Sequence, residues 1–132
     1  MSADDKNKSP ILSAQGLYVR RSDGAMILED VSLSVQPGEI LGLVGESSAG
    51  KSMIGSAVAG LLPAGVKLVG GSIVLEGRSL EDLSEEERRQ IRGAKIGMIM
   101  QDPLSSLDPL LTIGEHFRET FAAHGFHLTK ED

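Results

Sequence analysis

One stretch constrains the fold more than any other part of the chain. It reads Gly45-Glu46-Ser47-Ser48-Ala49-Gly50-Lys51-Ser52 and fits the pattern G-x-x-x-x-G-K-[ST]. In such a loop the glycines let the backbone curl so that successive N–H groups point at a polyphosphate, which a side chain would obstruct. The pattern therefore predicts a phosphate-binding loop, or P-loop.

The end of this loop supplies the polar groups that a nucleotide needs. We expect Lys51 to place its ammonium on the β- and γ-phosphates, and the Ser52 hydroxyl to bind the Mg²⁺ that bridges them. Ser52 also opens a predicted helix, whose positive dipole end would face the same anion. The candidate nucleotide-binding residues are Gly45, Glu46, Ser47, Ser48, Ala49, Gly50, Lys51, Ser52 and Met53.

The flanks of the loop test the motif, which needs a buried strand before it and a helix after it. Residues Glu39–Val44 are almost wholly apolar, which is typical of a strand buried on both faces of a parallel sheet. Residues Ser52–Leu62 are rich in small and apolar side chains and stop at Pro63, which indicates a helix. We therefore predict an α/β fold around a P-loop, rather than a glycine-rich turn that matches by chance.

Composition limits the class of protein. The chain has 132 residues, enough for one globular domain. Its net charge of -6 argues against nucleic-acid binding, because Lys and Arg must neutralise phosphates there. The absence of cysteine excludes disulfides and thiol metal sites. No apolar stretch approaches the ~18 residues of a membrane-spanning helix, and no signal-peptide core is present.

Short elements are predicted elsewhere. Met1–Pro10 is polar without periodicity and is expected to be a disordered leader. Strands over Ile11–Arg20 and Met26–Val35 should pair in an antiparallel manner. Two capping boxes indicate helix starts. The later predictions are a loop from Pro63 to Gly70, a strand over Gly71–Gly77, a helix from Ser84 and Glu87 through Arg92, a strand over Ile96–Met100, an irregular loop over Leu104–Leu111, a helix from Thr112 and Glu115, and a cap at Thr129 with Asp132.

These residues resemble the ATP-binding subunit of ABC transporters, in the branch that takes up dipeptides, oligopeptides and nickel. The resemblance rests on Val31–Val35, on Gly38–Ser47 leading into the Walker A loop, and on Gly60–Pro63. Its most specific part is Met98–Pro109, which is similar to the Q-loop of that branch. The resemblance implies an ABC ATPase core with an antiparallel β subdomain, incomplete at the C-terminus, with residues 11–132 as the N-terminal part of the domain.

The resemblance also implies a mechanism and partners. Gln101 would contact the Mg²⁺ and the attacking water, so it is the candidate catalytic residue and, with Ser52, a candidate metal ligand. ATP and Mg²⁺ would be the cofactors. The loop after Gln101 would touch a transmembrane permease, and a second ATP-binding subunit would complete a dimer. An extracytoplasmic solute-binding protein would act indirectly, and the chain would lie peripherally on the cytoplasmic face of the inner membrane.

Two positions depart from the family pattern. Ser48 stands where the family usually has Gly. The family also places an aromatic residue near the end of the first strand to stack on adenine, and that position here is Arg21. Tyr18 is three residues early and would face another way if the strand alternates. Either the Arg21 guanidinium lies against the base or that contact is lost.

Other family motifs are missing from these 132 residues. They are the signature motif, the Walker B strand with its carboxylates, and the switch histidine. The histidines His116, His124 and His127 match none of these and are expected to be ordinary surface or packing residues. We therefore expect the chain alone to bind Mg-ATP weakly, to lack ATPase activity and to be marginally stable, with unpaired strand edges.

Two alternatives remain open. The chain could be a truncated nucleotide-binding or interaction fragment that hydrolyses nothing. It could also be another P-loop enzyme, such as a small-molecule kinase or a GTPase. A GTPase would need a guanine-reading Asn-Lys-x-Asp, which Asn7-Lys8-Ser9-Pro10 does not provide, and a kinase leaves Gln101–Pro109 unexplained.

Overall fold

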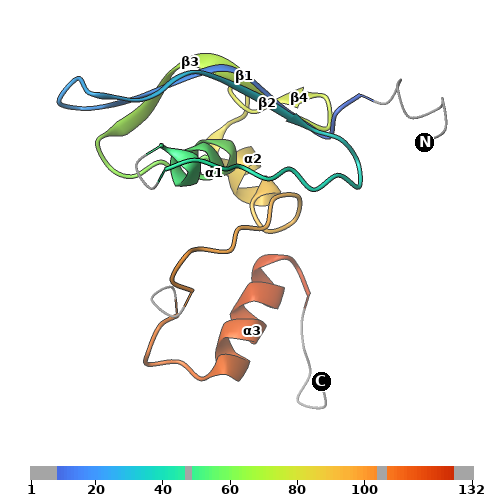
Figure 1. The fold of residues 1–132 in the computed structure, drawn as a ribbon. Coiled ribbons are helices and arrows are strands. Elements are labelled where there is room, and N and C mark those ends of the chain that lie inside the picture. Colours follow the sequence, from blue (N-terminus) through green and yellow to red (C-terminus); the bar gives the residue numbers. More distant parts are fainter. Residues whose placement is uncertain (1–8, 47–48, 104–106, 127–132) are drawn as a thin grey trace. The chain divides into compact units, whose positions relative to one another are not determined.

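The chain divides into two compact units, residues 1–88 and residues 89–132. The computed structural model describes residues 9–46, 49–103 and 107–126. The first unit holds a β-sheet with helix α1 (Lys51–Ala59), and the second holds helix α3 (Ile113–Ala123) (Figure 1). Helix α2 (Glu85–Ile91) lies across the division between them. Residues 1–8 of the expected leader Met1–Pro10 lie outside the described residues.

The sheet of the first unit is antiparallel, with the strand order β2-β1-β3-β4. The central strand β1 (Leu12–Arg21) pairs with β2 (Met26–Val35) on one side and with β3 (Val66–Leu75) on the other. The short β4 (Arg78–Ser79) completes the sheet beside β3. The predicted pair of antiparallel strands is confirmed, within one residue at each end.

The third strand corrects one prediction. Residues expected to form a loop from Pro63 to Gly70 enter β3 at Val66. Val66 and Leu68 pack against the core, while Lys67 between them is exposed. The alternation typical of a half-buried strand was therefore present, but Gly70 and Gly71 read as a strand boundary although the strand continues through them.

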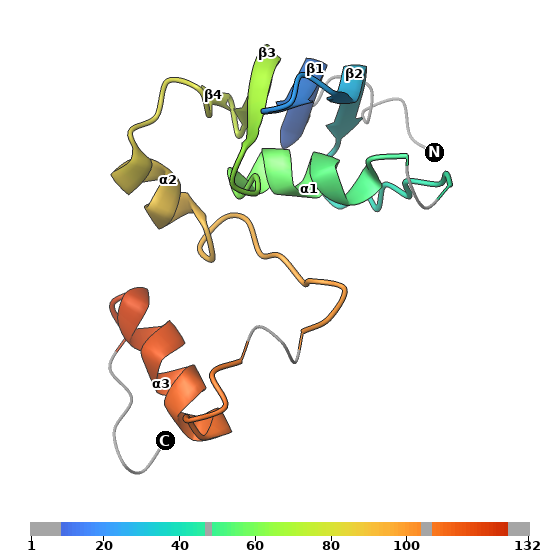
Figure 2. The same cartoon turned by 90° about the vertical axis from the view of Figure 1, so that its left-hand side faces the viewer.

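The core lies between the sheet and helix α1, which crosses one face of the strands (Figure 2). It is wholly aliphatic, as the 3% aromatic content of the chain implies. The helix starts and stops close to the predicted points, and Gly60, with φ 66°, donates its N–H to the carbonyl of Ala57 at 3.1 Å. The buried cluster consists of Ala14, Leu17, Val19, Leu28, Ile54, Ala57 and Ile73.

Two predicted strands are absent, which corrects the expected parallel sheet. Residues 39–44 form no strand, and Ile40 and Val44 are 97% and 100% exposed. Residues 96–100 make only one isolated bridge, between Arg92 and Ile96, and Ile99 is 92% exposed. An apolar run becomes a buried strand only where neighbouring strands and covering helices exist. Within the described residues neither segment has such neighbours, so its backbone stays irregular.

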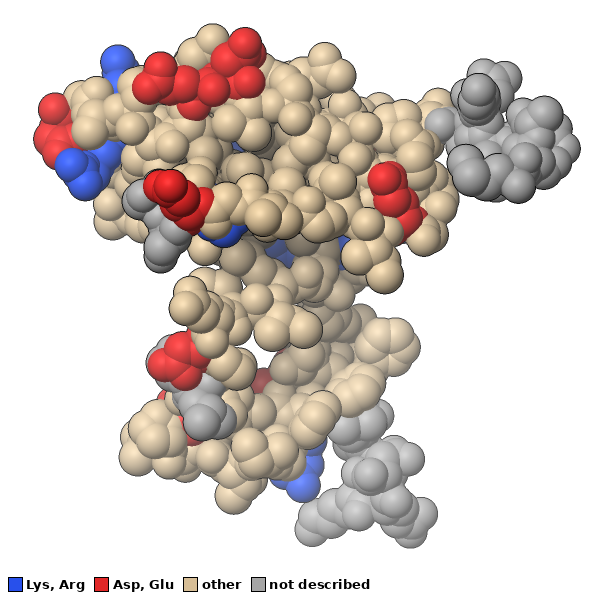
Figure 3. Space-filling view, viewed as in Figure 1, with Lys and Arg blue, Asp and Glu red and all other residues tan. Residues whose placement is uncertain are grey.

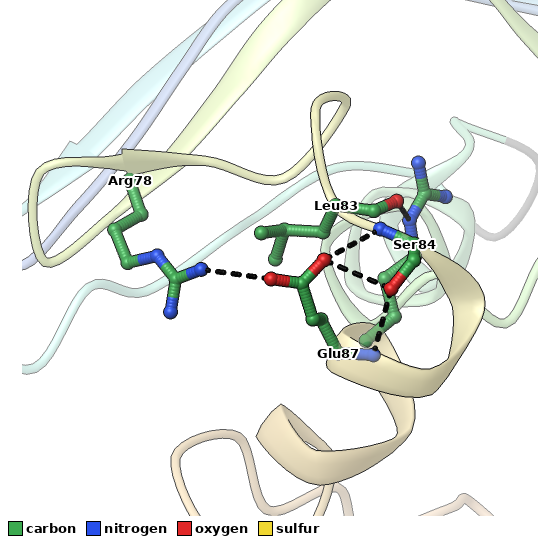
Figure 4. A network of polar contacts seen from close by, with 5 residues as sticks. Arg78, Leu83, Ser84 and Glu87 are labelled. Carbon is green, nitrogen blue, oxygen red and sulfur yellow. Dashed lines mark hydrogen bonds and ion pairs between the residues drawn. The ribbon is translucent and has the colours of Figure 1, made fainter.

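Both predicted capping boxes are confirmed. At the start of α2, a carboxylate oxygen of Glu87 accepts hydrogen bonds from the Ser84 backbone N–H at 2.9 Å and from the Ser84 hydroxyl at 2.8 Å (Figure 4). The other oxygen of Glu87 faces Arg78 at 3.3 Å. At the start of α3, Thr112 accepts a hydrogen bond from the Glu115 backbone N–H at 3.3 Å, and the Glu115 carboxylate accepts one from the Thr112 backbone N–H at 2.7 Å.

These caps predict a loss of helix in acid. The Ser84 and Thr112 backbone N–H groups hold the pKa of Glu87 and of Glu115, respectively, below the usual glutamate value. Because the folded pKa is lowered, the stabilisation is complete above the ordinary value of about 4.3 and is lost as the pH falls through the lowered values. Helical circular dichroism should therefore decline below pH ~4.

A double variant, Glu87→Gln with Glu115→Gln, is the matched control for this pH dependence. Glutamine can still close a capping box, but it does not titrate. The double variant should show a flatter pH profile than the unaltered chain between pH 5 and pH 2. Equal slopes in the two proteins would contradict the assignment of the acid-sensitive stability to these two caps.

The second unit has a small packed end next to α3. The Phe121 and Phe126 rings meet edge to face with their centroids 6.2 Å apart. The His124 ring packs against Gly93, and the His116 ring nitrogen Nε2 lies 3.2 Å from the carbonyl oxygen of Asp108. These two histidines have the packing roles that we expected. Residues 107–111 are irregular as predicted, while Leu104–Ser106, His127 and the cap at Thr129 fall outside the described residues.

The surface agrees with the acidic composition. Figure 3 shows one side of the molecule, where acidic side chains form small separate groups among largely uncharged surface. This view offers no broad basic area of the kind that nucleic-acid binding needs. Within the described residues, no helix combines the length and the apolar character that a membrane crossing requires.

A candidate phosphate-binding loop

The candidate loop leads directly into helix α1. Gly50 is the residue that precedes the first turn of α1, and Lys51 and Ser52 begin that turn. Gly45, Glu46 and Ala49 form the approach to it and are exposed. Ser47 and Ser48 lie outside the described residues. The structure therefore brings together the glycine, the lysine and the hydroxyl that the motif places in sequence.

Gly50 has a backbone that only glycine adopts easily. Its φ is 75°, in the left-handed region where an L-residue is strained. A Cβ at this position would lie 2.6 Å from the Cδ2 of Leu28 and 3.1 Å from the carbonyl oxygen of Ile27. The loop is thus pressed against β2, and this contact fixes the start of α1 on the sheet.

The Lys51 side chain turns back over the loop. Its ammonium donates hydrogen bonds to the carbonyl oxygen of Gly45 at 2.6 Å and to the carbonyl oxygen of Glu46. A further bond, from the Ala49 N–H to the Glu46 carbonyl at 3.1 Å, closes the turn. The carbonyl oxygens of Gly45 and Glu46 therefore hold the Lys51 ammonium at the loop.

The N-terminus of α1 differs from that of the capped helix α3. Among the residues that the structure describes, no side chain caps α1 at Gly50, and the first turn of α1 contains no acidic residue. The N-terminus of α3, in contrast, is closed by Thr112 and Glu115. The first N–H groups of a helix need an acceptor, and the helix dipole favours an anion there. With Lys51 and the exposed Ser52 in the same turn, these residues have the charge and the hydrogen-bond donors that a polyphosphate needs.

Gln101 belongs to the second unit and is exposed. The segment before it, residues 96–100, is not the strand that was predicted to position its amide. The assigned role of Gln101 at the metal and the attacking water stays a prediction.

Arg21 is the last residue of β1, and its side chain is held by Asp23 in the turn that follows. Its guanidinium lies 2.6 Å from the Asp23 carboxylate, and the Nε–H donates to the same oxygen at 2.8 Å. Hydrogen bonding from Arg21 lowers the pKa of Asp23, helped by the backbone N–H of Ala25. The sequence analysis missed this ion pair, although a spacing of two residues across a tight turn was a usable signal.

Tyr18 faces away from the core, as the alternation of the strand predicts. Its neighbours Leu17 and Val19 are fully buried, whereas Tyr18 is 38% exposed. The tyrosine ring lies over Gly70 of the adjacent strand, where a Cβ would come within 3.3 Å of it. Tyr18 therefore does not take the place of the missing aromatic residue.

Comparison with known proteins agrees with this site. Residues 28–131 match the ABC transporter family, and the chain belongs to that family. Membership implies ATP binding. The resemblance inferred from the Walker A and Q-loop segments is thereby confirmed.

Several similar proteins are named for peptide or oligopeptide transport. A probable peptide ABC transporter ATP-binding protein of Sinorhizobium fredii is 44% identical over 99 residues, which cover 74% of this chain and 30% of that protein. The oligopeptide transport ATP-binding protein AmiE of Streptococcus pneumoniae is 40% identical over 130 residues, 96% of this chain and 37% of AmiE. OppD of Haemophilus influenzae, also an oligopeptide transport ATP-binding protein, is 40% identical over 119 residues, 88% of this chain and 36% of OppD. The chain thus spans about a third of the length of these relatives.

Proposed function

We propose that this chain is the phosphate-binding part of an ATP-binding subunit that couples ATP binding and hydrolysis to the transport of a solute across a membrane. The solute is a peptide or nickel, in keeping with the sequence resemblance and with the peptide transport named for the relatives. The observation that carries the proposal is the start of α1, which no described side chain caps, together with the Lys51 ammonium in its first turn.

Different residues of the chain bind the phosphates and the metal ion of the nucleotide. The N–H groups at the start of α1 and the Lys51 ammonium bind the β- and γ-phosphates. The Lys51 ammonium has three donors, of which the Gly45 and Glu46 carbonyls take two, so a donor can serve a phosphate oxygen. The Ser52 hydroxyl and the Gln101 amide are the chain's ligands for Mg²⁺, which would neutralise the charge that develops on the phosphates.

The proposed partners follow from the same assignment. The loop after Gln101 contacts a transmembrane permease, and a second ATP-binding subunit, identical or different, completes the dimer. A solute-binding protein outside the cytoplasm delivers the solute. The chain then acts as a peripheral protein on the cytoplasmic face of the inner membrane.

The base contact of this subunit is made by Arg21. Cross-strand pairing places Arg21 opposite Val66, whose side chain packs on the core, so Arg21 lies on the face of the sheet that α1 covers. A guanidinium plane can stack on a purine, and Asp23 holds this one in place.

The experiment that tests this function is a binding measurement with two ligands. Titration calorimetry should detect Mg-ATP and Mg-tripolyphosphate at the same site, each displacing the other. ATP at about 100 times its dissociation constant should also raise the melting temperature, because it stabilises the folded chain by about 2.7 kcal/mol. Absence of any competing phosphate binding would overturn the proposal.

Gln101→Ala should affect turnover more than binding. In the assembled transporter, the variant should keep its ATP affinity within a few-fold, because the phosphate loop is intact. Transport-linked hydrolysis should fall, since one contact to the metal and the water is lost. Hydrolysis measured with permease and solute, beside ATP affinity, checks this. Normal hydrolysis that stays coupled to transport would contradict the role given to Gln101.

A second function is favoured by one observation. In the part of the chain that the structure describes, residues 39–44 pair with no other strand, and Ile40 and Val44 are almost fully exposed. Such an apolar surface is typical of a chain that associates with another protein. In that case the chain binds nucleotide poorly and hydrolyses none. In the assembled transporter, ATP turnover that disappears in Lys51→Ala would decide for the first function.

A further inference from the structure

Three neighbouring strands break their regular pattern on one line across the sheet. Gly16 in β1 has φ 55°, Asp30 in β2 has φ 50°, and Gly71 in β3 has φ 93°. The register between β1 and β2 shifts between Ala14 and Leu17, and that between β1 and β3 shifts between Gln15 and Tyr18. We call Gly16, Asp30 and Gly71 the bulge line. A bulge of this kind adds one residue and re-aims the side chains that follow it.

The bulge line reverses which side chains face the core. In β1, Ala14 is fully buried before the line, and Leu17 and Val19 are fully buried after it. Successive residues of a strand alternate between its two faces, so an unbroken strand that buries Ala14 would also point residues 16, 18 and 20 inward. The extra residue at Gly16 turns Leu17 and Val19 inward instead and puts Arg21 on the same face of the sheet, where its side chain is exposed.

The flanking strands reverse at the same place. In β3, Ile73 is 2% exposed on one side of the line, and Leu68 and Val66 pack on the core on the other side. In β2, Leu28 is 3% exposed, whereas Val31 and Leu33 pack on the core beyond Asp30. The three long strands β1, β2 and β3 therefore share the reversal, which keeps one continuous apolar face under them.

Specific contacts hold the bulge in place. The Gly16 N–H donates a hydrogen bond to the hydroxyl of Ser32 at 2.9 Å. A Cβ on Gly71 would lie 2.6 Å from the carbonyl oxygen of Gln15 and closer still to that of Gly16. β1 and β3 thus approach each other so tightly at the bulge that Gly71 must lack a side chain.

The consequence for the site concerns the two adjacent arginines at the end of β1. After the bulge, Arg20 pairs with the exposed Lys67 and Arg21 pairs with the core residue Val66. The same end of the core face touches the loop, because Val19 pairs with Leu28 and Leu28 borders Gly50. Without the reversal, Arg20 would take the inward position.

We propose that Gly16 is a positioning residue for nucleotide recognition: through the bulge line it selects Arg21, and not Arg20, to emerge on the face of the sheet beside the phosphate loop. This inference rests on the proposed function, since it needs a nucleotide in the loop. Gly16 itself touches no ligand and acts through Arg21.

The test compares two ligands that share the phosphates and differ in the nucleoside. The base advantage is the ratio of the dissociation constant for Mg-tripolyphosphate to that for Mg-ATP, measured by calorimetry on the purified chain. Arg21→Ala should lower it about two- to fivefold, the size of an exposed cation–π contact. Arg20→Ala, the matched control with the same loss of charge, should leave it unchanged. Arg20→Ala and Arg21→Ala should change the affinity for tripolyphosphate by equal amounts.

Variants of Gly16 then test positioning. Gly16→Val cannot easily hold φ 55° and should lose the base advantage as Arg21→Ala does, while tripolyphosphate still binds. Gly16→Asn, which tolerates the left-handed region, should keep it. If Gly16→Val does not fold, Gly16→Ala and Ser32→Ala replace it, measured well below their melting temperatures, and should lower the base advantage in the same direction.

The possible outcomes distinguish a failure of this inference from a failure of the proposed function on which it rests. A lower melting temperature with an unchanged base advantage in the Gly16 and Ser32 variants means a purely structural bulge and overturns the inference. Equal effects of Arg20→Ala and Arg21→Ala, or a base advantage of about one in the unaltered chain, overturn it as well. In each of these cases tripolyphosphate binding leaves the proposed function standing. If neither ligand binds the unaltered chain, the proposed function fails, and this inference fails with it.

Discussion

Lys51→Ala should lower the affinity for Mg-tripolyphosphate and Mg-ATP at least tenfold. The substitution removes the ammonium that the loop backbone surrounds, with its bonds to the Gly45 and Glu46 carbonyls. Charge-assisted hydrogen bonds contribute about 1.5–3 kcal/mol, which corresponds to roughly ten- to a hundredfold in affinity. Calorimetric titration of both ligands measures the loss.

Lys67→Ala is the control for Lys51→Ala. Lys67 is exposed on β3 and the variant loses the same single charge, so a general electrostatic effect would appear in both. Melting curves of each variant separate weak binding from a damaged fold. Unchanged affinity in a folded Lys51→Ala protein would remove the assignment of the phosphate loop.

Sequence reasoning succeeded where the signal is local. A capping box needs only two residues three positions apart, and both predicted boxes are present at α2 and α3. The helix after the loop was predicted from its composition and from Pro63, and the structure has it at Lys51–Ala59. The β1–β2 pair likewise follows from alternation and a short turn.

Sequence reasoning failed where a segment depends on distant neighbours. Residues 39–44 and 96–100 have the apolar pattern of buried strands, but a strand forms only when another strand supplies its hydrogen bonds. Those partners are absent from the described residues, and Ile40, Val44 and Ile99 are exposed. An apolar pattern shows which side chains a segment would bury. It does not show whether the neighbouring strands and helices that would bury them are present.

For the site, sequence predicted the residues and missed the geometry. The motif named Gly50, Lys51 and Ser52, and these meet at one helix start. It did not contain the contact between Gly50 and Leu28, or the ion pair of Arg21 with Asp23. The sequence does not predict the bulge line, because the glycines Gly70 and Gly71 indicate a strand boundary as readily as a bulge inside a strand. Three breaks on neighbouring strands become one feature only when the register of those strands is known.

Gly71→Ala should destabilise the first unit by about 3 kcal/mol or more, the sum of the left-handed backbone cost and the cost of overpacking. Its Cβ would overlap main-chain carbonyl oxygens of Gln15 and Gly16. No side chain can move to relieve that overlap, so β1 and β3 must separate at the bulge line.

Gly77→Ala isolates the steric part of that effect. Gly77 has φ 79°, and a Cβ there would have no heavy atom within 4 Å. It should therefore show only the backbone cost, about 1 kcal/mol. Urea unfolding of both variants gives the two free energies, and the gap between them measures how closely β1 and β3 approach. The close approach of β1 and β3 holds the reversal in both strands. Equal losses of stability for Gly71→Ala and Gly77→Ala would mean that the two strands can separate at the bulge line without cost. In that case Gly16 alone must hold Arg21 in place.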